Sequence, residues 1–322
     1  MLLVALIITA FISVMLGAVN FTIPGLFSAL FHPDEIQRKI LFDIRIPRVL
    51  NAVLVGASLS ASGIILQSLL RNNLAEPGLL GISAGAGLGA IIIFLLPVSV
   101  SFMLLTPVSF IFALLATISI FVIARGLNSK YTNFISSNKI ILAGIAINAL
   151  ISSVNGYLLI ASGSSVSQIL FWLSGGLSGR GWNEFNMIIV FVCIGLVSAL
   201  LLSKSLNVLN LGEELSSSLG LNVKLIQKIS IAVASLLAAS AVSISGIISF
   251  VGLIVPNISK MIIGTDNRYA VPCAMLLGAE FFVVADTVAR IIIAPSEIPT
   301  GIVISFVGAP VFIWLILKRK NY

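Results

Sequence analysis

Ten long runs of mainly apolar residues follow one another along this chain, with only short polar segments between them. A membrane-spanning helix needs about 20 such residues. The runs are continuous and lack the alternating pattern of a membrane β-barrel, so helices are the expected spanning elements. The expected spans cover roughly residues 2–19, 49–69, 79–97, 102–124, 140–160, 186–203, 226–247, 248–264, 271–293 and 301–317.

The seventh and eighth runs are joined, with no charged residue between Lys228 and Lys260. That stretch is too long for one ordinary span, so we place a break near Ser245-Gly246. Hydrophobic residues make up 59% of the chain and charged residues 9%, proportions that exclude a water-soluble globule. The sequence therefore predicts an all-α polytopic membrane protein in which residues 1–322 form a single transmembrane domain.

The distribution of basic residues predicts the orientation of the chain, because cytoplasmic loops carry an excess of lysine and arginine. With both termini in the cytoplasm, 12 of the 18 basic residues lie inside. The remaining six need a separate reason, and they are Arg38, Lys39, Arg45, Arg48, Arg180 and Arg290. The first residues lack the positive leader region of a secretory signal peptide, so we expect the first span to be retained.

Several classes of enzyme are excluded by what the sequence lacks. His32 is the only histidine, and Cys193 and Cys273 do not have metal-ligand spacing, so neither a zinc site nor a serine–histidine arrangement is expected. No glycine-rich phosphate loop ends in Lys-Ser or Lys-Thr, so any ATP is expected to be bound by another chain. The scattered basic residues form no stripe for nucleic acid. We therefore expect no catalytic residue, metal site or cofactor in this chain.

The segment Arg71-Asn-Asn-Leu-Ala-Glu-Pro-Gly78 is a polar, proline-ended segment between two apolar runs. It follows Ile44-Arg-Ile-Pro-Arg48 and the small-residue run Gly56-Ala-Ser-Leu-Ser-Ala-Ser-Gly63, and it precedes Leu80-Gly-Ile-Ser-Ala-Gly-Ala-Gly-Leu-Gly89. In this order, the four segments resemble the signature of the FecCD family of permeases. Asn73 stands where that family usually has proline. The likeness continues over most of the chain after about Asp43.

The resemblance implies a fold and a function. FecCD permeases have a BtuC-like type II ABC importer fold and work in pairs in the bacterial cytoplasmic membrane, as a homodimer or with a similar paralogue. ABC ATPase subunits bind the ATP, and an extracytoplasmic binding protein delivers the substrate. A membrane-spanning permease for an iron-siderophore or related metal chelate is thus our first expectation, with haem or cobalamin as alternatives. An ion-driven secondary transporter is the alternative from a different class.

The expected cytoplasmic loop at residues 204–225 is longer than a turn between two spans requires. Glu213, Glu214 and Leu215 precede Gly220 with helical spacing, which predicts a short helix stopped by glycine. This loop resembles the coupling element by which ABC importer permeases dock on their ATPase. An ordinary amphipathic helix lying on the lipid headgroups is the alternative. An ion-driven secondary transporter would leave this loop unexplained.

Residues that line the transport path are suggested by two regions. The run Ser245–Lys260 resembles a family motif around Pro256, although Asn257, Lys260 and later Asn267 replace the family's histidine, arginine and second histidine. A proline inside a helix kinks it, and broken helices line pathways in transporters. By position in the family, the fifth span would also contribute polar residues to the path, namely Asn148, Ser152, Ser153 and Asn155. Each of these side chains is also suited to hydrogen bonding between helices.

The same resemblance explains why arginines would lie on the external side of the membrane. Arg45, Arg48 and Arg290 match family positions that receive glutamates from the binding protein, a role that suits the bidentate geometry of arginine. Headgroup binding at the outer interface is the alternative. Asp286 and Arg290 are four residues apart, so they share a helix face and are placed to pair. Glu280 lies nearly on the opposite face of that helix.

Overall fold

The computed structural model describes residues 1–17, 35–96, 98–126 and 137–318. His32, Lys130, Arg319, Lys320 and the end of the first expected span lie outside the described residues. The described part is all-α, as predicted. Its helices, in chain order, are α1 (Leu2–Met15), α3 (Glu35–Arg38), η1 (Lys39–Arg45), α4 (Ile46–Leu70), η2 (Pro77–Leu80), α5 (Ile82–Leu95), α6 (Val98–Arg125), α7 (Ser137–Ala161), η3 (Gly163–Ser165), α8 (Val166–Leu173), α9 (Trp182–Asn210), α10 (Glu213–Ser218), α11 (Val223–Ser245), α12 (Val251–Ile263), α13 (Asn267–Ile291) and α14 (Thr300–Lys318).

The ten predicted spans are confirmed as helices. Within the described ranges, seven helices are long and apolar enough to cross a membrane, and α1, α5 and α12 are shorter apolar helices. The predicted break at Ser245-Gly246 is confirmed, because α11 ends at Ser245 and Gly246 has a φ of +68°. The second span is longer than expected, since α3 and η1 extend α4 into one helix over Ile36–Leu70. The short helix α8 was not predicted.

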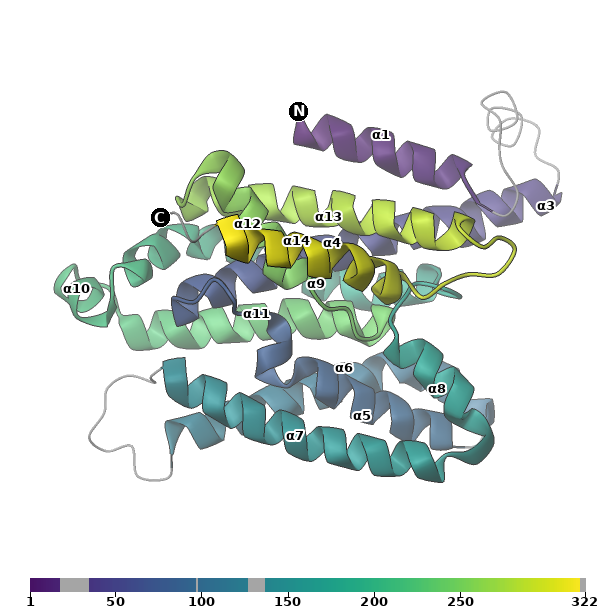
Figure 1. The fold of residues 1–322 in the computed structure, drawn as a ribbon, viewed down its shortest axis with the longest axis horizontal. Coiled ribbons are helices and arrows are strands. Elements are labelled where there is room, and N and C mark those ends of the chain that lie inside the picture. Colours follow the sequence, from purple (N-terminus) through teal and green to yellow (C-terminus); the bar gives the residue numbers. More distant parts are fainter. Residues whose placement is uncertain (18–34, 97, 127–136, 319–322) are drawn as a thin grey trace.

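The helices form a bundle whose long axis is horizontal in Figure 1. In both views α5, α6, α7 and α8 form one group below α11, and the remaining helices lie above it. The short helices α8 and α10 mark opposite ends of the bundle. We refer to these ends as the α8 end and the α10 end.

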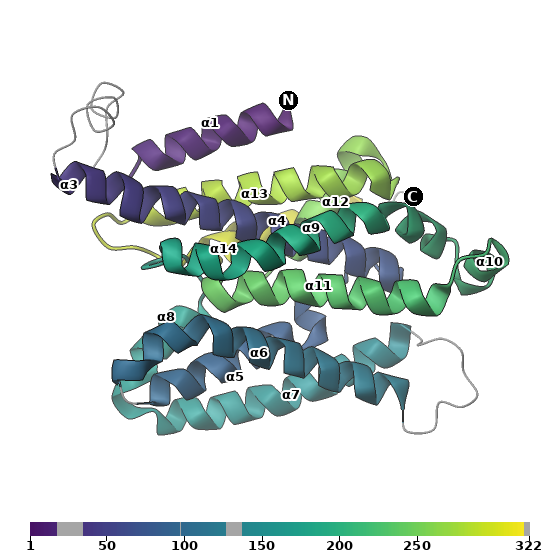
Figure 2. The same cartoon turned by 180° about the vertical axis from the view of Figure 1, so that it is seen from behind.

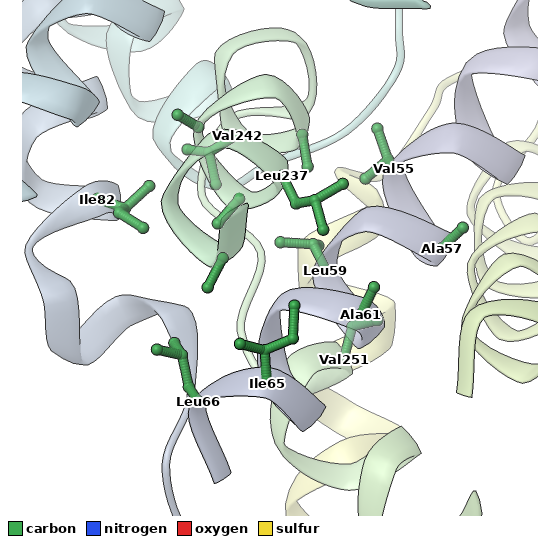
Figure 3. Packing of buried hydrophobic residues seen from close by; sticks show 14 of the residues in the cluster. Val55, Ala57, Leu59, Ala61, Ile65, Leu66, Ile82, Leu237, Val242 and Val251 are labelled. Carbon is green, nitrogen blue, oxygen red and sulfur yellow. The ribbon is translucent and has the colours of Figure 1, made fainter. Parts of the chain in front are cut away.

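Helix α4 lies at the centre of the bundle, with 83% of its apolar window buried. Its small residues allow neighbouring helices to approach closely, the usual basis of helix packing in membranes. A side chain at Gly56 would collide with the backbone of Gly278 in α13, and one at Gly63 with the backbone of Gly252 in α12. Around these contacts, branched side chains fill the core, with Leu59 and Leu237 facing each other in Figure 3.

Two of the shorter helices, α5 and α12, begin after unwound segments inside the bundle. Residues 71–76 and η2 precede α5, and residues 246–250 precede α12. The two segments meet where the ring of Pro77 lies against Gly252. Backbone of this kind is tolerated within a membrane protein where other helices bury it or where it lines a cavity.

Candidate functional site

An ion-paired group of buried side chains joins α4, α13 and the start of α14 at the α8 end. Arg48 donates from Nε and Nη2 to the two carboxylate oxygens of Asp286, at 2.9 and 3.0 Å. Its Nη1 donates to both oxygens of Glu297, at 2.9 and 3.0 Å. Arg290 Nε lies 3.3 Å from Asp286, and the hydroxyl of Thr300 donates to the same carboxylate at 3.0 Å. We call these five residues the arginine cluster.

The predicted pairing of Asp286 with Arg290 is confirmed, but Arg48 is the closer partner. Arg48 is 5% exposed and Asp286 is 1% exposed. Bidentate arginine–carboxylate pairs are strong and geometrically specific. They offset the cost of placing these charges away from water. The cluster therefore fixes the position of α13 against α4.

The same end of the bundle holds the first helix. Arg45 Nη1 donates to the carbonyl oxygens of Val14 and Met15 at 2.8 and 3.0 Å. Arg290 Nη2 donates to the hydroxyl of Ser13 at 2.7 Å and to its carbonyl oxygen at 3.1 Å. These carbonyls belong to the last turn of α1, which has no intrahelical donors for them. Two arginines thus cap the end of α1.

The three arginines predicted to receive a binding protein are therefore brought together, but as buried side chains. Arg45, Arg48 and Arg290 are each 5–6% exposed. Their guanidinium groups contact α1, Asp286 and Glu297 rather than the surface. Docking by these arginines stays a prediction, and in this conformation Glu297 is the more exposed member of the arginine cluster, with 32% of its side chain exposed.

The polar residues predicted on the fifth span divide into two kinds. Asn148 Nδ2 donates to the carbonyl oxygen of Gly78 at 3.0 Å, and Asn155 Nδ2 donates to that of Ala84 at 3.1 Å. Both amides therefore tie α7 to the unwound segment and α5. Ser152 and Ser153 lie on the exposed face of α7, where the Ser153 hydroxyl donates back to Ala149 at 2.9 Å.

A hydrogen-bonded group, which we call the amide cluster, lies at the α10 end and comprises Gln67, Asn73, Asn257 and Lys260. Lys260 Nζ donates to Gln67 Oε1 at 3.0 Å and to Asn73 Oδ1 at 3.5 Å. Asn257 Nδ2 donates to the carbonyl oxygen of Asn73 at 3.0 Å. Three positions at which the sequence departs from the family pattern are thus in contact, whereas Asn267 is buried separately and accepts from Ser68 at 3.3 Å.

A pocket of about 530 Å³ lies beside the amide cluster. Arg71, Asn210 and Phe312 are among its lining residues, so the pocket joins the ends of α4, α9 and α14. Pro256 lies inside α12, directly before Asn257. Because proline has no N–H, the carbonyl oxygen of Gly252 lacks its helical donor. Of the predicted path residues, Asn257 lines this pocket, and Pro256 precedes it in α12.

Glu76 and Phe250 were missed as site residues. Phe250 precedes α12 with a φ of +69°, a backbone conformation that is unfavourable for a bulky residue. The Glu76 carboxylate accepts a hydrogen bond from the backbone amide of Phe250. The Phe250 ring lies 6.4 Å from that of Phe312 in α14. The hydrogen bond between Glu76 and Phe250 is thus a further link between the two unwound segments, and the Phe250 ring lies close to α14. No local sequence pattern marks Phe250 for this role.

The predicted short helix at the α10 end is confirmed. Helix α10 covers Glu213–Ser218, and Gly220 follows it with a φ of +84°. Leu211, Leu215 and Leu219 recur every fourth residue and are 57%, 59% and 66% exposed. Leu211 ends α9 and is separated from α10 by Gly212, whose φ is +108°, whereas Leu215 lies within α10 and Leu219 directly follows it. The loop around α10 therefore exposes three leucines together with Glu214.

The link between α12 and α13 carries an ion pair, Asp266 with Arg268. The Asp266 carboxylate accepts from the backbone amide of Arg268 at 2.9 Å and from Asn207 Nδ2 at 2.6 Å. An ion pair with the Arg268 guanidinium, at 2.6 Å, adds to these bonds. Together, and with the Arg268 side chain contributing most, they lower the pKa of Asp266 below its ordinary value.

Among the described residues, no group of three or more histidine, cysteine, aspartate or glutamate side chains is arranged to hold a metal ion. Cys193 is exposed and Cys273 is buried, and neither forms a disulfide. The chemistry that the described site residues offer is therefore hydrogen bonding, charge pairing and apolar contact.

Comparisons with known proteins agree with this arrangement. A model of the FecCD transport family matches residues 5–318. The chain is 36% identical to the hemin transport system permease protein HmuU of Yersinia pestis, over 99% of this chain and 95% of that protein. It is 34% identical to the vitamin B12 import system permease protein BtuC of Vibrio parahaemolyticus, over 98% and 94%. A solved structure described as an inward-facing metal-chelate type ABC transporter superposes with a TM-score of 0.87 and 30% identity, over 98% and 97%.

Proposed function

This chain belongs to the FecCD transport family, and from that premise we propose that it is the permease subunit of an ATP-driven importer for an iron-siderophore or related metal chelate. In this proposal residues 1–322 form one transmembrane domain of the bacterial cytoplasmic membrane. ATP is bound by partner ATPase subunits, and an extracytoplasmic binding protein delivers the substrate. Haem and cobalamin are the alternative substrates, since relatives of this chain include permeases for both.

The observation that carries the proposal is the exposed apolar surface of residues 211–219, the loop that contains α10. A loop that only connected α9 and α11 would gain nothing from three leucines facing water, because burying each one is worth about 1.5–3 kcal/mol. A second protein that covers Leu211, Leu215 and Leu219 would recover this energy. The glutamates that begin α10 fit a partner with basic residues around an apolar cleft, and an ATPase subunit is the partner we propose.

A second permease is proposed to pack against the face that carries α7 and α14. These two helices have only 22% of their apolar windows buried, far less than α4. Ser152 and Ser153 lie on the exposed side of α7. In this arrangement the path would run between the two subunits, and the pocket beside the amide cluster would lie at its cytoplasmic mouth. Polar residues on an otherwise apolar surface favour contact with a second subunit over exposure to lipid.

We propose that the α10 end is cytoplasmic and that both termini lie on that side. Ten apolar helices that cross in alternation return the chain to the side on which it began. The α10 end also carries Arg71, Lys260 and Arg268. Arg45, Arg48 and Arg290, three of the six basic residues on the opposite side, are engaged in the arginine cluster and the cap of α1, so they carry less weight as a signal of orientation.

The decisive experiment is uptake into proteoliposomes that contain this chain, its ATPase and its binding protein. Ferric siderophores, haem and cobalamin would be offered in turn. We expect uptake of one of them that requires ATP and all three proteins. Uptake that persists without the ATPase but collapses with an ion gradient would establish the ion-driven transporter instead.

A matched pair of glycine variants sharpens this experiment. Gly220 and Gly264 both have positive φ, at +84° and +96°, with no atom within 4 Å of an added Cβ. Alanine at either position should strain the backbone by a similar amount. We expect Gly220→Ala combined with Glu214→Ala to abolish ATP-driven uptake while the protein remains in the membrane. Gly264→Ala should retain most of the uptake.

A further inference from the structure

The pocket beside the amide cluster combines two basic side chains with an apolar wall. Arg71 and Lys260 carry the charges among its described lining residues. Side chains of α12 and α14 form the apolar wall, namely Met261, Phe312, Leu315 and Ile316. The pocket volume of about 530 Å³ lies within the range of about 300–1,000 Å³ that is usual for small-molecule sites. The pocket therefore has the size and the mixed lining of a ligand site.

The charged groups lie at two different walls of this pocket. Lys260 Nζ donates to Gln67 Oε1 at 3.0 Å and to Asn73 Oδ1 at 3.5 Å, and both acceptor residues also line the pocket. Arg71 Nη1 lies 3.4 Å from the position that a Cβ of Gly212 would take, at the junction of α9 and α10. The ammonium thus belongs to the α12 side of the pocket and the guanidinium to the α9 side.

Two cationic groups of different geometry suit an oxyanion. A guanidinium presents a fork of N–H donors that matches a carboxylate or a phosphate, whereas an ammonium acts as a compact point charge. Hydrogen bonds between such groups and an oxyanion are stronger than those between neutral groups. The apolar wall would contact the hydrocarbon part of the same ligand. The pocket therefore fits an organic anion better than a neutral or cationic molecule.

The exposure of these side chains suits a ligand that is bound and then released. Arg71 is exposed, and Lys260 is half-buried. Water and salt screen an exposed charge, so an anion that binds there is held less firmly than it would be in a closed site. A transport path needs sites of this kind, favourable enough to be entered and weak enough to be left.

We propose that this pocket is a subsite for a carboxylate-bearing arm of the cargo, occupied as the cargo leaves the path. The inference rests on the proposed function, which places the pocket at the cytoplasmic mouth of a path between two permeases. Arg71 would bind the carboxylate in its fork, and Lys260 would add a second positive charge. The cargo is thereby narrowed to anionic molecules, such as a ferric hydroxamate with a free carboxylate, or haem with its propionates.

Binding of a matched pair of chelates to the purified permease tests the proposal without the ATPase or the binding protein. One is a ferric trihydroxamate with a free carboxylate, and the other is the same chelate with that group converted to a primary amide. In nanodiscs of zwitterionic lipid, equilibrium dialysis with radioactive iron should show the acid chelate bound about tenfold more tightly, the scale of one hydrogen bond to a charged group. This preference should shrink as the salt concentration is raised from about 50 to 500 mM.

Arg71→Gln should abolish the preference, and it should fold normally because Arg71 is exposed. Lys204→Gln is the matched control, since it removes one exposed positive charge from α9 without changing a lining residue, and it should keep the preference. Three results would overturn the subsite: equal binding of the two chelates by the wild type, no binding of either, or a preference that survives in Arg71→Gln.

An anionic phospholipid headgroup shares the chemistry of the proposed ligand, because basic pockets between membrane helices also bind lipid phosphates. Replacement of part of the zwitterionic lipid by phosphatidylglycerol separates the two sources. The preference for the acid chelate should persist in these nanodiscs. Its loss would assign the pocket to a lipid headgroup and overturn the cargo assignment.

ATP-driven uptake into proteoliposomes reports separately on the importer. Arg71→Gln should lower uptake of the acid chelate by a factor similar to its effect on binding, and it should leave uptake of the amide chelate unchanged. An equal fall for both chelates would contradict a contact with the carboxylate. Failure of the wild type to take up any substrate would instead count against the proposed function, while the dialysis result would still decide whether the pocket binds a carboxylate.

Discussion

At the α8 end of the bundle, four charged side chains are packed against one another and against the end of α1, whereas at the α10 end the loop that contains α10 exposes Leu211, Leu215 and Leu219. The first region buries its charges, and the second exposes apolar surface. This difference reverses the usual expectation that charges mark the surface for a partner. It indicates that the arginine cluster fixes the helices of this chain, and that the α10 element is the surface open to another protein.

The largest expected effect comes from breaking the arginine cluster. Asp286→Ala would leave Arg48 and Arg290 without their shared carboxylate, and removal of one partner from a buried ion pair costs about 3–5 kcal/mol. We expect a large loss of folded, monodisperse protein and a marked fall in thermal stability in detergent. Glu280→Ala is the matched control, because it removes an acid of the same helix that forms no ion pair with the described part of the chain. Equal stability of the two variants would contradict the role assigned to the cluster.

This expectation changes how a docking role for the arginines should be tested. Charge reversal at Arg48 or Arg290 would disturb the fold before it reported on a binding protein, since both side chains are 5–6% exposed. A substitution of Glu297, whose side chain is 32% exposed, should disturb the fold much less.

The second prediction concerns the opposite end, where function should be lost without stability. Leu215→Ala should reduce ATP-driven uptake by about tenfold or more, because truncation of an interface anchor costs about 2 kcal/mol. Its melting temperature should stay close to that of the wild type, since exposed substitutions usually change stability by less than about 0.5 kcal/mol. Leu201→Ala, on the exposed face of α9, is the control and should leave both properties unchanged. A loss of uptake in both variants would remove the distinction between α10 and the lipid-facing surface.

The third prediction measures how far the arginine cluster tolerates a smaller change. Glu297→Gln removes the charge of the cluster's most exposed member while Asp286 still pairs with Arg48. We expect a destabilisation of about 0.5–1 kcal/mol, typical of a partly exposed ion pair. Thermal unfolding of the purified protein would show this as a shift much smaller than that of Asp286→Ala. If binding-protein affinity falls while the melting temperature holds, Glu297 also takes part in docking.

The features that were predictable from the sequence are those encoded by neighbouring residues. The apolar runs predict the ten spans, Gly220 marks the end of the short helix, and the spacing of Asp286 and Arg290 predicts their pairing. The partner of Arg48 is 238 residues away in the sequence. No local pattern encodes that contact, which exists only once α4 and α13 pack at Gly56.

The same reasoning explains the uncertain part of the predicted path. An asparagine in an apolar helix has the same sequence signature whether it contacts a neighbouring helix or a passing substrate. Asn148 and Asn155 bond to backbone carbonyls of Gly78 and Ala84, and only the tertiary structure supplies those carbonyls. Gly78 lies in the 3-10 turn η2 and Ala84 in the first turn of α5, two elements that are distant from α7 in the sequence.

The smallest effect is expected from Asp266, which belongs to neither of the contrasted regions but lies close to the α10 end. Hydrogen bonds from Arg268 and Asn207 lower the pKa of its carboxyl below the ordinary value of 3.8. The unfolded chain therefore takes up this proton at a higher pH than the folded protein does, so the stabilisation is present above pH 3.8 and is lost as the pH falls through the folded value.

Asp266→Asn removes that dependence. Melting temperatures recorded from neutral pH down to about pH 3 should therefore fall less steeply for Asp266→Asn than for the wild type. Parallel curves would mean that the Asp266 carboxylate caps α13 without adding any stability that depends on its charge. In that case the buried charges that stabilise the fold would be those of the α8 end.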